Sequence, residues 1–135
     1  MKDTKLKLNS PDEVEAVYYE AFGHCDARVM AALWADGDVV CIHPGSGTIT
    51  GHEAVARSWQ HIFTDTQQAE IKYTVVKKTL ADDLAVHLVT EEIGAGDELA
   101  LVLATNVYQK SQHGWLMIEH HSSLVQSRPP NQTVQ

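Results

Sequence analysis

Residues 98–125 read ELALVLATNVYQKSQHGWLMIEHHSSLV. Two long runs of aliphatic, β-branched and aromatic residues, 98–110 and 114–125, flank the turn residues SQHG, which predicts an antiparallel hairpin. Two similar runs come before them at 69–80 and 84–93, joined by DD and followed by GAGD. We therefore expect residues 69–125 to form a meander of four antiparallel strands.

The first half of the chain has the periodicity of helices. Ser10, followed by proline and two acidic residues, predicts a helix start, and apolar positions then recur every three to four residues. Asp26 is expected to cap a second, shorter helix, and a third is expected after Gly51. A short buried strand is predicted at residues 39–42 between them. Helices followed by strands indicate an α+β fold with the helices on one face of the sheet.

Length and charge restrict the classes of function. The chain has 135 residues and a net charge of -8 at pH 7, which argues against nucleic acids and anionic membranes as partners. It contains no apolar run of the ~20 residues that a membrane span needs, and its first residues lack an apolar segment, so we expect no signal peptide. Two cysteines without CxxC spacing are expected to be reduced in a cytoplasmic protein. We expect one domain over residues 1–127 and a disordered tail over 128–135.

The turns also predict which side chains share a face of the sheet. Pairing of Ser111 with Gly114 places Asn106 opposite Glu119, and pairing of Gly94 with Asp97 gives the neighbouring register. One predicted face combines polar and small residues: His87, Val89, Glu91, Val102, Ala104, Asn106, Tyr108, Glu119, His121 and Ser123. The other is aliphatic: Leu88, Leu99, Leu101, Leu103, Val107, Leu116, Ile118 and Leu124. Small residues beside converging polar groups indicate space for a ligand on the first face.

Three titratable side chains are the candidates for catalysis: His43, Glu91 and His121. His43 ends the strand at 39–42, and the other two lie on the predicted polar face. Burial would raise the pKa of Glu91 and suit it to acid or base chemistry. The alternatives are a solvated glutamate near a strand end and histidines that only satisfy the backbone or the core.

The candidates for ligand binding are aromatic or polar: Trp34, Trp59, Asn106, Tyr108, Ser123 and Tyr18. For the tryptophans, core packing is the alternative interpretation. His120 and His121 point to opposite sides of a strand, so no metal site is expected, and no cofactor motif is present. His120 is predicted to lie on the aliphatic face.

The closing hairpin has a Thr-x-Val segment, then a tryptophan after the turn and a His-x-Ser on the last strand: Thr105, Val107, Trp115, His121 and Ser123. In these residues it resembles the SnoaL-like branch of the nuclear-transport-factor-2-like superfamily. Residues 34–63 resemble it through Trp34, His43-Pro44, Gly51 and Trp59. The similarity extends over roughly residues 11–125 in element order.

The resemblance implies a cone-shaped, strongly bent, mostly antiparallel sheet wrapped around three N-terminal helices, with a ligand pocket and a homodimer contact on the convex side. The similar association domain of calcium/calmodulin-dependent kinase has pocket arginines that would fall on Glu91 and Asn106, so an anion-binding pocket is not implied. Ketosteroid isomerase and scytalone dehydratase share the fold and use pocket Asp, Tyr or His. Tyr18 lies on the helix that would carry an oxyanion donor.

We therefore predict a small-molecule-binding SnoaL-like domain that forms homodimers. One alternative is an isomerase, dehydratase or cyclase that uses His or Glu to transfer protons on an apolar carbonyl compound. Another is a dimerisation module with a vestigial pocket. The residues predicted at the dimer contact are Leu101, Leu103, Leu116 and Ile118, because a sheet apolar on both faces needs a second cover.

Overall fold

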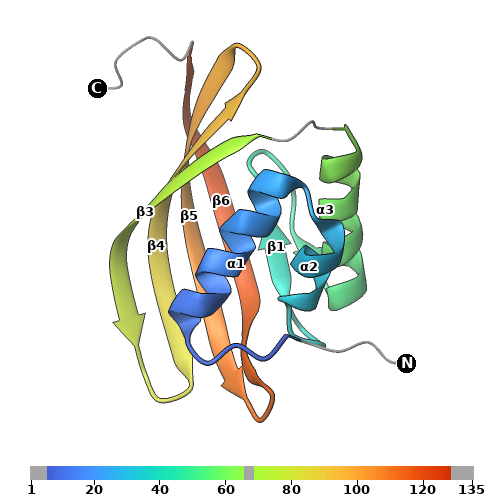
Figure 1. The fold of residues 1–135 in the computed structure, drawn as a ribbon, viewed down its shortest axis with the longest axis vertical. Helices are drawn as coiled ribbons and strands as arrows, with labels where there is room; N and C mark the ends of the chain where they lie inside the picture. The colour runs from blue at the N-terminus through green and yellow to red at the C-terminus, as the bar shows by residue number, and fades with distance from the viewer. Residues whose placement is uncertain (1–5, 66–68, 129–135) are drawn as a thin grey trace.

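The computed structural model describes residues 6–65 and 69–128, and the described chain forms a bent sheet with helices on its concave side (Figure 1). The helices are α1 (Pro11–His24), α2 (Ala27–Ala32) and α3 (His52–Asp65). The strands are β1 (Val40–Ile42), β2 (Ile49–Thr50), β3 (Glu70–Leu80), β4 (Leu84–Ala95), β5 (Glu98–Ser111) and β6 (Gly114–Arg128). The predicted tail lies outside the described residues, except for Arg128 at the end of β6.

The predicted helix starts are confirmed by their caps. The Ser10 hydroxyl accepts a hydrogen bond from the Glu13 amide at 3.1 Å, and the Asp26 carboxylate accepts one from the Val29 amide at 3.0 Å. In α1 the buried stripe is wider than predicted, because it includes Glu15 and Tyr19 as well as the apolar residues. This helix therefore brings polar groups into the interior.

The sheet has the strand order β2-β1-β6-β5-β4-β3. Strands β3 to β6 form the predicted antiparallel meander, and β1 is added to its edge parallel to β6. Helix α1 crosses the concave face and contacts β3, β5 and β6, while α2 and α3 lie together beside β1 (Figure 1). The predicted α+β cone is confirmed. No described helix combines the length and hydrophobicity needed to cross a bilayer.

The hairpin between β4 and β5 turns later than predicted. Gly94 pairs with Leu99 rather than with Asp97, because the turn falls at Gly96-Asp97, where Gly96 has a φ of +62°. The register thus moves by two residues, so Asn106 pairs with His87. A two-residue shift keeps every side chain on its predicted face, and the inward positions of Glu91 and Asn106 are confirmed.

The last hairpin contains a β-bulge that overturns part of the predicted face. Ser111 pairs with Gly114 as predicted, but the register shifts between Val107 and Tyr108, leaving Ile118 without a partner in β5. Between this bulge and a second register shift after Leu124, each β6 residue points to the face opposite the predicted one. His120 and Ser122 are buried in the cone, whereas His121 and Ser123 are exposed on the outer side.

The bulge predicts opposite outcomes for two adjacent histidines. His120→Ala should lower the free energy of unfolding by about 3 kcal/mol, because it leaves a cavity and unpaired buried partners. His121→Ala should change it by less than about 0.5 kcal/mol, as expected for an exposed side chain. Urea unfolding of both variants measures the difference, and a larger loss for His121→Ala would show that the bulge is misplaced.

Candidate functional site

A chain of buried hydrogen bonds links α1 to the concave face of the sheet. The Tyr18 hydroxyl lies 3.2 Å from His120 Nε2, and His120 Nδ1 lies 2.5 Å from Asn106 Oδ1. Asn106 Nδ2 donates to the Tyr19 hydroxyl at 3.0 Å, and Tyr19 donates to Glu91 Oε2 at 2.6 Å. None of these five side chains is more than 4% exposed. The chain is therefore closed to solvent and ends at a carboxylate.

The carboxamide of Asn106 determines the direction of these hydrogen bonds. Its oxygen only accepts, so His120 must carry its proton on Nδ1, and the Tyr18 hydroxyl must donate to Nε2. Its nitrogen only donates, so the Tyr19 hydroxyl accepts from Asn106 and gives its own proton to Glu91 Oε2. Oε2 is thereby held as an acceptor, and Oε1 is the oxygen of Glu91 that can take up a proton.

Glu91 has the protonation behaviour of an acid–base group. Burial raises its pKa from 4.5 to about 7, and the hydrogen bond from Tyr19 only partly opposes the rise. Among the described residues no lysine or arginine forms an ion pair with it. A carboxyl group in this state exchanges protons near neutral pH.

The groups around Glu91 stay neutral over the same pH range. Burial lowers the pKa of His120 to about 3, with smaller contributions from the charges of His43 and His121. Burial, followed by the nearby charge of Glu91, raises the pKa of both Tyr18 and Tyr19. Among these hydrogen-bonded residues, Glu91 is therefore the one that titrates near pH 7.

An aromatic wall around Trp59 of α3 lies beside the chain of hydrogen bonds. The Trp59 ring lies 5.8 Å from Tyr18, 5.0 Å from Phe22 and 4.7 Å from His43, measured between centroids. His43 Nε2 contacts the Ser58 hydroxyl at 3.0 Å, and burial lowers the pKa of this half-buried histidine. His43 thus lies beside the aromatic wall, without a direct contact to Glu91.

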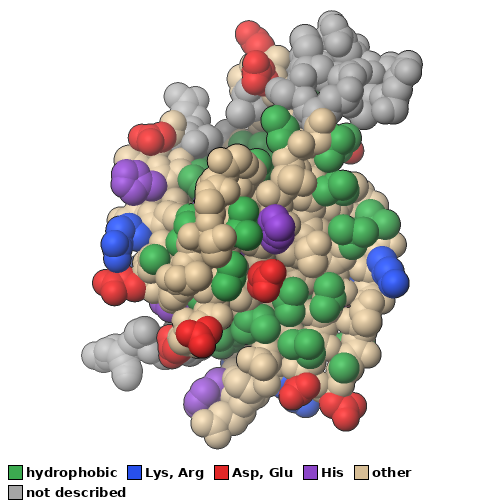
Figure 2. Space-filling view, turned by 180° about the vertical axis from the view of Figure 1, so that it is seen from behind, with side chains coloured by type: hydrophobic (Ala, Val, Ile, Leu, Met, Phe, Trp, Pro, Cys, Tyr) green, Lys and Arg blue, Asp and Glu red, His purple; other side chains and the backbone are tan. Residues whose placement is uncertain are grey.

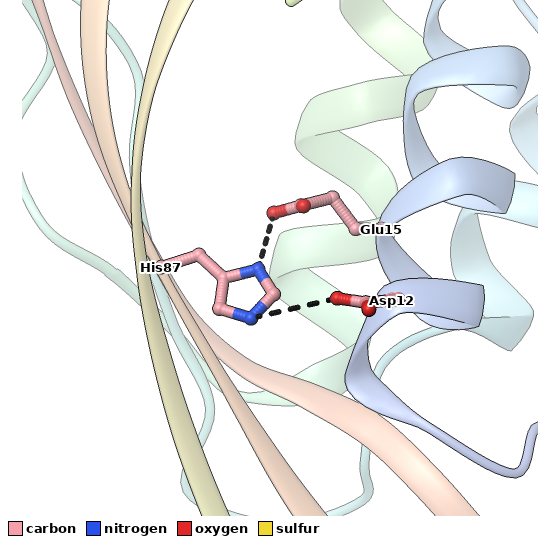
Figure 3. A group of neighbouring side chains, drawn as sticks. All are labelled: Asp12, Glu15 and His87. Atoms are coloured by element: carbon pink, nitrogen blue, oxygen red, sulfur yellow. Dashed lines mark hydrogen bonds and ion pairs between the residues drawn. The ribbon is translucent and has the colours of Figure 1, made fainter. Parts of the chain in front are cut away.

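A second polar cluster lies toward the N-terminal end of α1. Glu15 Oε2 accepts from the Tyr108 hydroxyl at 2.7 Å and lies 2.9 Å from His87 Nδ1, while His87 Nε2 lies 3.9 Å from Asp12 (Figure 3). An imidazole and two carboxylates are a donor set that suits a metal ion, and their ligand atoms lie within 4.8 Å of one another. The Lys78 ammonium already lies 3.0 Å from Asp12. As it stands, the cluster fastens α1 to β4 and β5.

The structure brings together some of the predicted site residues. Glu91, Asn106 and Tyr18 share one hydrogen-bond chain, Trp59 packs against it, and Tyr108 belongs to the neighbouring cluster. His121 and Ser123 were predicted to face the same interior and do not, because the β6 bulge turns them outward. Trp34 is buried and forms a parallel β-bridge with Met117.

Three important residues were missed by sequence reasoning. Tyr19 and Glu15 lie on α1 at positions that widen its buried stripe, and His120 was assigned to the wrong face. The spacing Glu15, Tyr18, Tyr19 follows the i, i+3, i+4 pattern of one helix face. That pattern was a usable signal for Glu15 and Tyr19. No turn residue marks the bulge that turns His120 inward.

Comparison with known proteins places this architecture in a family. The family model described as a SnoaL-like domain matches residues 12–127. The chain belongs to the SnoaL-like domain family. A Thiobacillus denitrificans structure bearing the name of the calcium/calmodulin-dependent protein kinase type II association domain is 32% identical, with a TM-score of 0.85. The alignment covers 90% of this chain and 100% of that one.

Two further relatives of this SnoaL-like domain have different names. A Streptomyces avermitilis structure named as a dehydratase of the NTF2-like family is 30% identical with a TM-score of 0.76, over 84% of this chain and 92% of that one. The F-box protein SKIP8 of Arabidopsis thaliana is 31% identical over 99 residues, 73% of this chain. The match spans only 42% of SKIP8. One fold thus accompanies names from different functional classes.

The raised pKa of Glu91 predicts how stability depends on pH. The folded state holds this proton up to about pH 7 and the unfolded state only up to about pH 4.5, so raising the pH between them disfavours folding. Relative to wild type, Glu91→Gln should gain on the order of 3 kcal/mol over that interval, then level off. Denaturant unfolding at a series of pH values measures the gain. A pH-independent difference would mean that Glu91 is not perturbed.

Proposed function

We propose that this SnoaL-like domain binds a small, largely apolar molecule inside the cone, with a hydrogen-bonding end directed at Glu91. The observation that carries the proposal is a carboxyl group 1% exposed, at the end of an ordered hydrogen-bond chain and without a cationic partner. Burying such a group is costly, and a fold that needed only a packed core would be served as well by an apolar residue.

Access for the ligand is proposed to lie beside Tyr73. This residue pairs with Glu91 across β3 and β4, and its ring stacks on Tyr19 at a centroid distance of 4.2 Å. Tyr73 is 36% exposed, so it is the member of this group that reaches the surface. Rotation of its side chain would uncover Tyr19 and Glu91 without disturbing the helices. The aromatic wall around Trp59 would then hold the apolar part of the ligand.

Ligand binding is tested with a panel of small cyclic alcohols and ketones, observed by saturation-transfer NMR. At least one compound should bind wild type, and Glu91→Leu should weaken it by about tenfold or more, because a hydrogen bond to a charged group contributes roughly 1.5–3 kcal/mol. Glu92→Leu is the matched control, since Glu92 is the exposed neighbour on the other face. Binding that survives Glu91→Leu unchanged would contradict the proposed site.

A second candidate function is proton transfer on a carbonyl compound. The pKa of Glu91 near 7 favours it, since a base poised near the working pH is the most effective, and one relative carries the name dehydratase. Glu91 Oε1 would take the proton from the carbon next to the carbonyl, while Tyr19 holds Oε2. His43 lies at the aromatic wall, and Tyr18 lies at the end of the hydrogen-bond chain that is farthest from Glu91. These positions suit contacts with a ligand better than proton transfer.

The enzyme hypothesis predicts exchange of α-protons in heavy water. A ketone that binds should lose its α-proton NMR signal faster with wild type than with buffer, and the rate should rise through about pH 7 as Glu91 ionises. Glu91→Gln should abolish the excess rate, because the amide cannot accept the proton. Binding without exchange would leave the domain as a binding module.

We also propose a homodimer through the outer face of the sheet. Hydrophobic side chains gather on this face among polar ones (Figure 2), and Leu88 and Leu103 are 37% and 39% exposed. Leu101 and Ile118 are half-buried, but Leu116 is only 5% exposed and is already covered within its own chain. Leu116 is therefore removed from the proposed interface. A cytoplasmic location stays a prediction from the sequence.

The dimer is tested by placing a charge on this face. Leu103→Asp should shift the mass measured by light scattering at micromolar concentration from two chains to one, because a buried unpaired carboxylate opposes association. Leu80→Asp, at the end of the edge strand β3, is an exposed control that should leave the dimer intact. A wild-type mass of one chain, or a Leu103→Asp dimer, would contradict this interface.

A further inference from the structure

The interior of the cone holds two buried carboxyl groups, and among the described residues only one of them has an imidazole beside it. The buried polar residues of the described chain are Glu15, His87, Glu91, Asn106, His120 and Ser122, with no lysine or arginine among them. Glu15 is satisfied by His87 at 2.9 Å and by the Tyr108 hydroxyl at 2.7 Å. Within residues 6–65 and 69–128, the hydrogen bond that Glu91 accepts from a side chain comes from the Tyr19 hydroxyl, and no cation there balances its charge when it is ionised.

The tyrosine that donates to this carboxyl group lies in a cluster of aromatic rings. Tyr19 stacks on Tyr73 at 4.2 Å with an interplanar angle of 18°, and on Phe22 at 6.5 Å with an angle of 15°. Tyr18 meets Tyr19 edge to face at 4.7 Å. Such a cluster packs against apolar groups, and a carboxylate beside it pairs with a cation in water-excluded surroundings. The combination suits a ligand with a cationic end and an apolar body.

We infer that the ligand bound at Glu91 is a cation, an organic ammonium whose apolar body packs against the aromatic wall around Trp59. Phe22 and Phe63 lie against Trp59 in this wall, with ring centroids 5.0 Å and 5.5 Å away. The inference rests on the proposed ligand-binding function of the same site. The ammonium group would donate to Glu91 Oε1, because Oε2 already accepts from Tyr19. Anionic ligands such as carboxylates and phosphates are disfavoured, since no cationic side chain is buried to receive them.

The same site makes binding depend on pH in a defined direction. The groups that face Glu91 are Tyr18 and Tyr19 from α1, Cys41 from β1 and Tyr73 from β3. Burial raises the pKa of each of them, to about 12 for Cys41, so they stay neutral near pH 7. Glu91 alone among them gains charge as the pH rises, and ammonium binding should strengthen with it. The Glu15–His87 pair lies toward the N-terminal end of α1. Any pH dependence of binding that comes from this pair should remain in a Glu91 variant, so the variant separates the two contributions.

The experiment uses three probes of one shape that differ in charge: 2-phenylethylamine, 2-phenylethanol and 3-phenylpropionate. The amine resembles lysine in its pKa, roughly 10, and is cationic throughout the range tested. Binding is followed through the Trp59 indole N–H in NMR titrations of the full chain at about pH 6 and about pH 8. The variants are Glu91→Gln, which keeps the shape and removes the charge, and Glu92→Gln as the control on the outer face.

We expect the amine to bind wild type at least about tenfold more tightly than the alcohol at the higher pH. Its affinity should rise roughly tenfold between the two pH values, in step with the ionised fraction of Glu91. Glu91→Gln should remove both the preference and the pH dependence, and Glu92→Gln should keep them. If the alcohol binds as tightly as the amine and both need Glu91, the inference is overturned while the ligand site stands. Preferred binding of phenylpropionate, or no binding of the amine, also overturns it, and the alcohol and ketone panel then decides whether the site binds ligands at all.

Discussion

Asn106 fixes the direction of the hydrogen bonds inside the cone, because a carboxamide exchanges its donor and acceptor ends only if it flips. Its oxygen accepts a hydrogen bond from His120, and its nitrogen donates one to the Tyr19 hydroxyl. Every hydrogen bond from Tyr18 onward is therefore donated in the direction of Glu91. A hydroxyl in place of the amide could reverse direction and blur this order. With the amide in place, Glu91 Oε2 is always an acceptor. The other oxygen, Oε1, is then the one that can take up or release a proton.

Burial gives this arrangement its energetic character. Each of the five hydrogen-bonded side chains is buried away from water, and a buried polar group without a partner would reduce stability by roughly 1–3 kcal/mol. All members except Glu91 are neutral and paired, so the cost of charge is concentrated on one residue. A ligand of the kind proposed, with a positive charge or a hydrogen-bond donor, would offset that cost, and its binding would therefore stabilise the fold.

Most of the architecture could be predicted from local signals. The caps at Ser10 and Asp26, the turn residues and the alternation in the last four strands led to the correct elements and the correct α+β cone. Glu91 and Asn106 were correctly predicted to point inward, since a register error of two residues leaves each side chain on the same face of the sheet. The placement thus survived a misplaced turn.

The rest of the site depends on features that the local sequence does not mark. A one-residue bulge at Ile118 exchanges His121 for His120, and Leu, Met and Ile around it offer no glycine or proline as a signal. Glu15 and Tyr19 became visible only when α1 was packed on the sheet, since a helix face is wider than its apolar stripe. The packing of α1 on the sheet therefore decides which polar side chains of the helix contact those of the strands.

The central claim is that Glu91 is a buried carboxyl group with a pKa near 7, held by a one-way chain of hydrogen bonds. The most direct measurement is a carbon-13 NMR titration of glutamate side-chain carboxyls, with the Glu91 signal assigned by its absence in Glu91→Gln. Our account predicts a midpoint at about pH 7 for this signal. It also predicts that Asn106→Leu, which removes the amide and its bond to Tyr19, will move that midpoint. A Glu91 signal that titrates near the ordinary value of 4.5 would contradict the account.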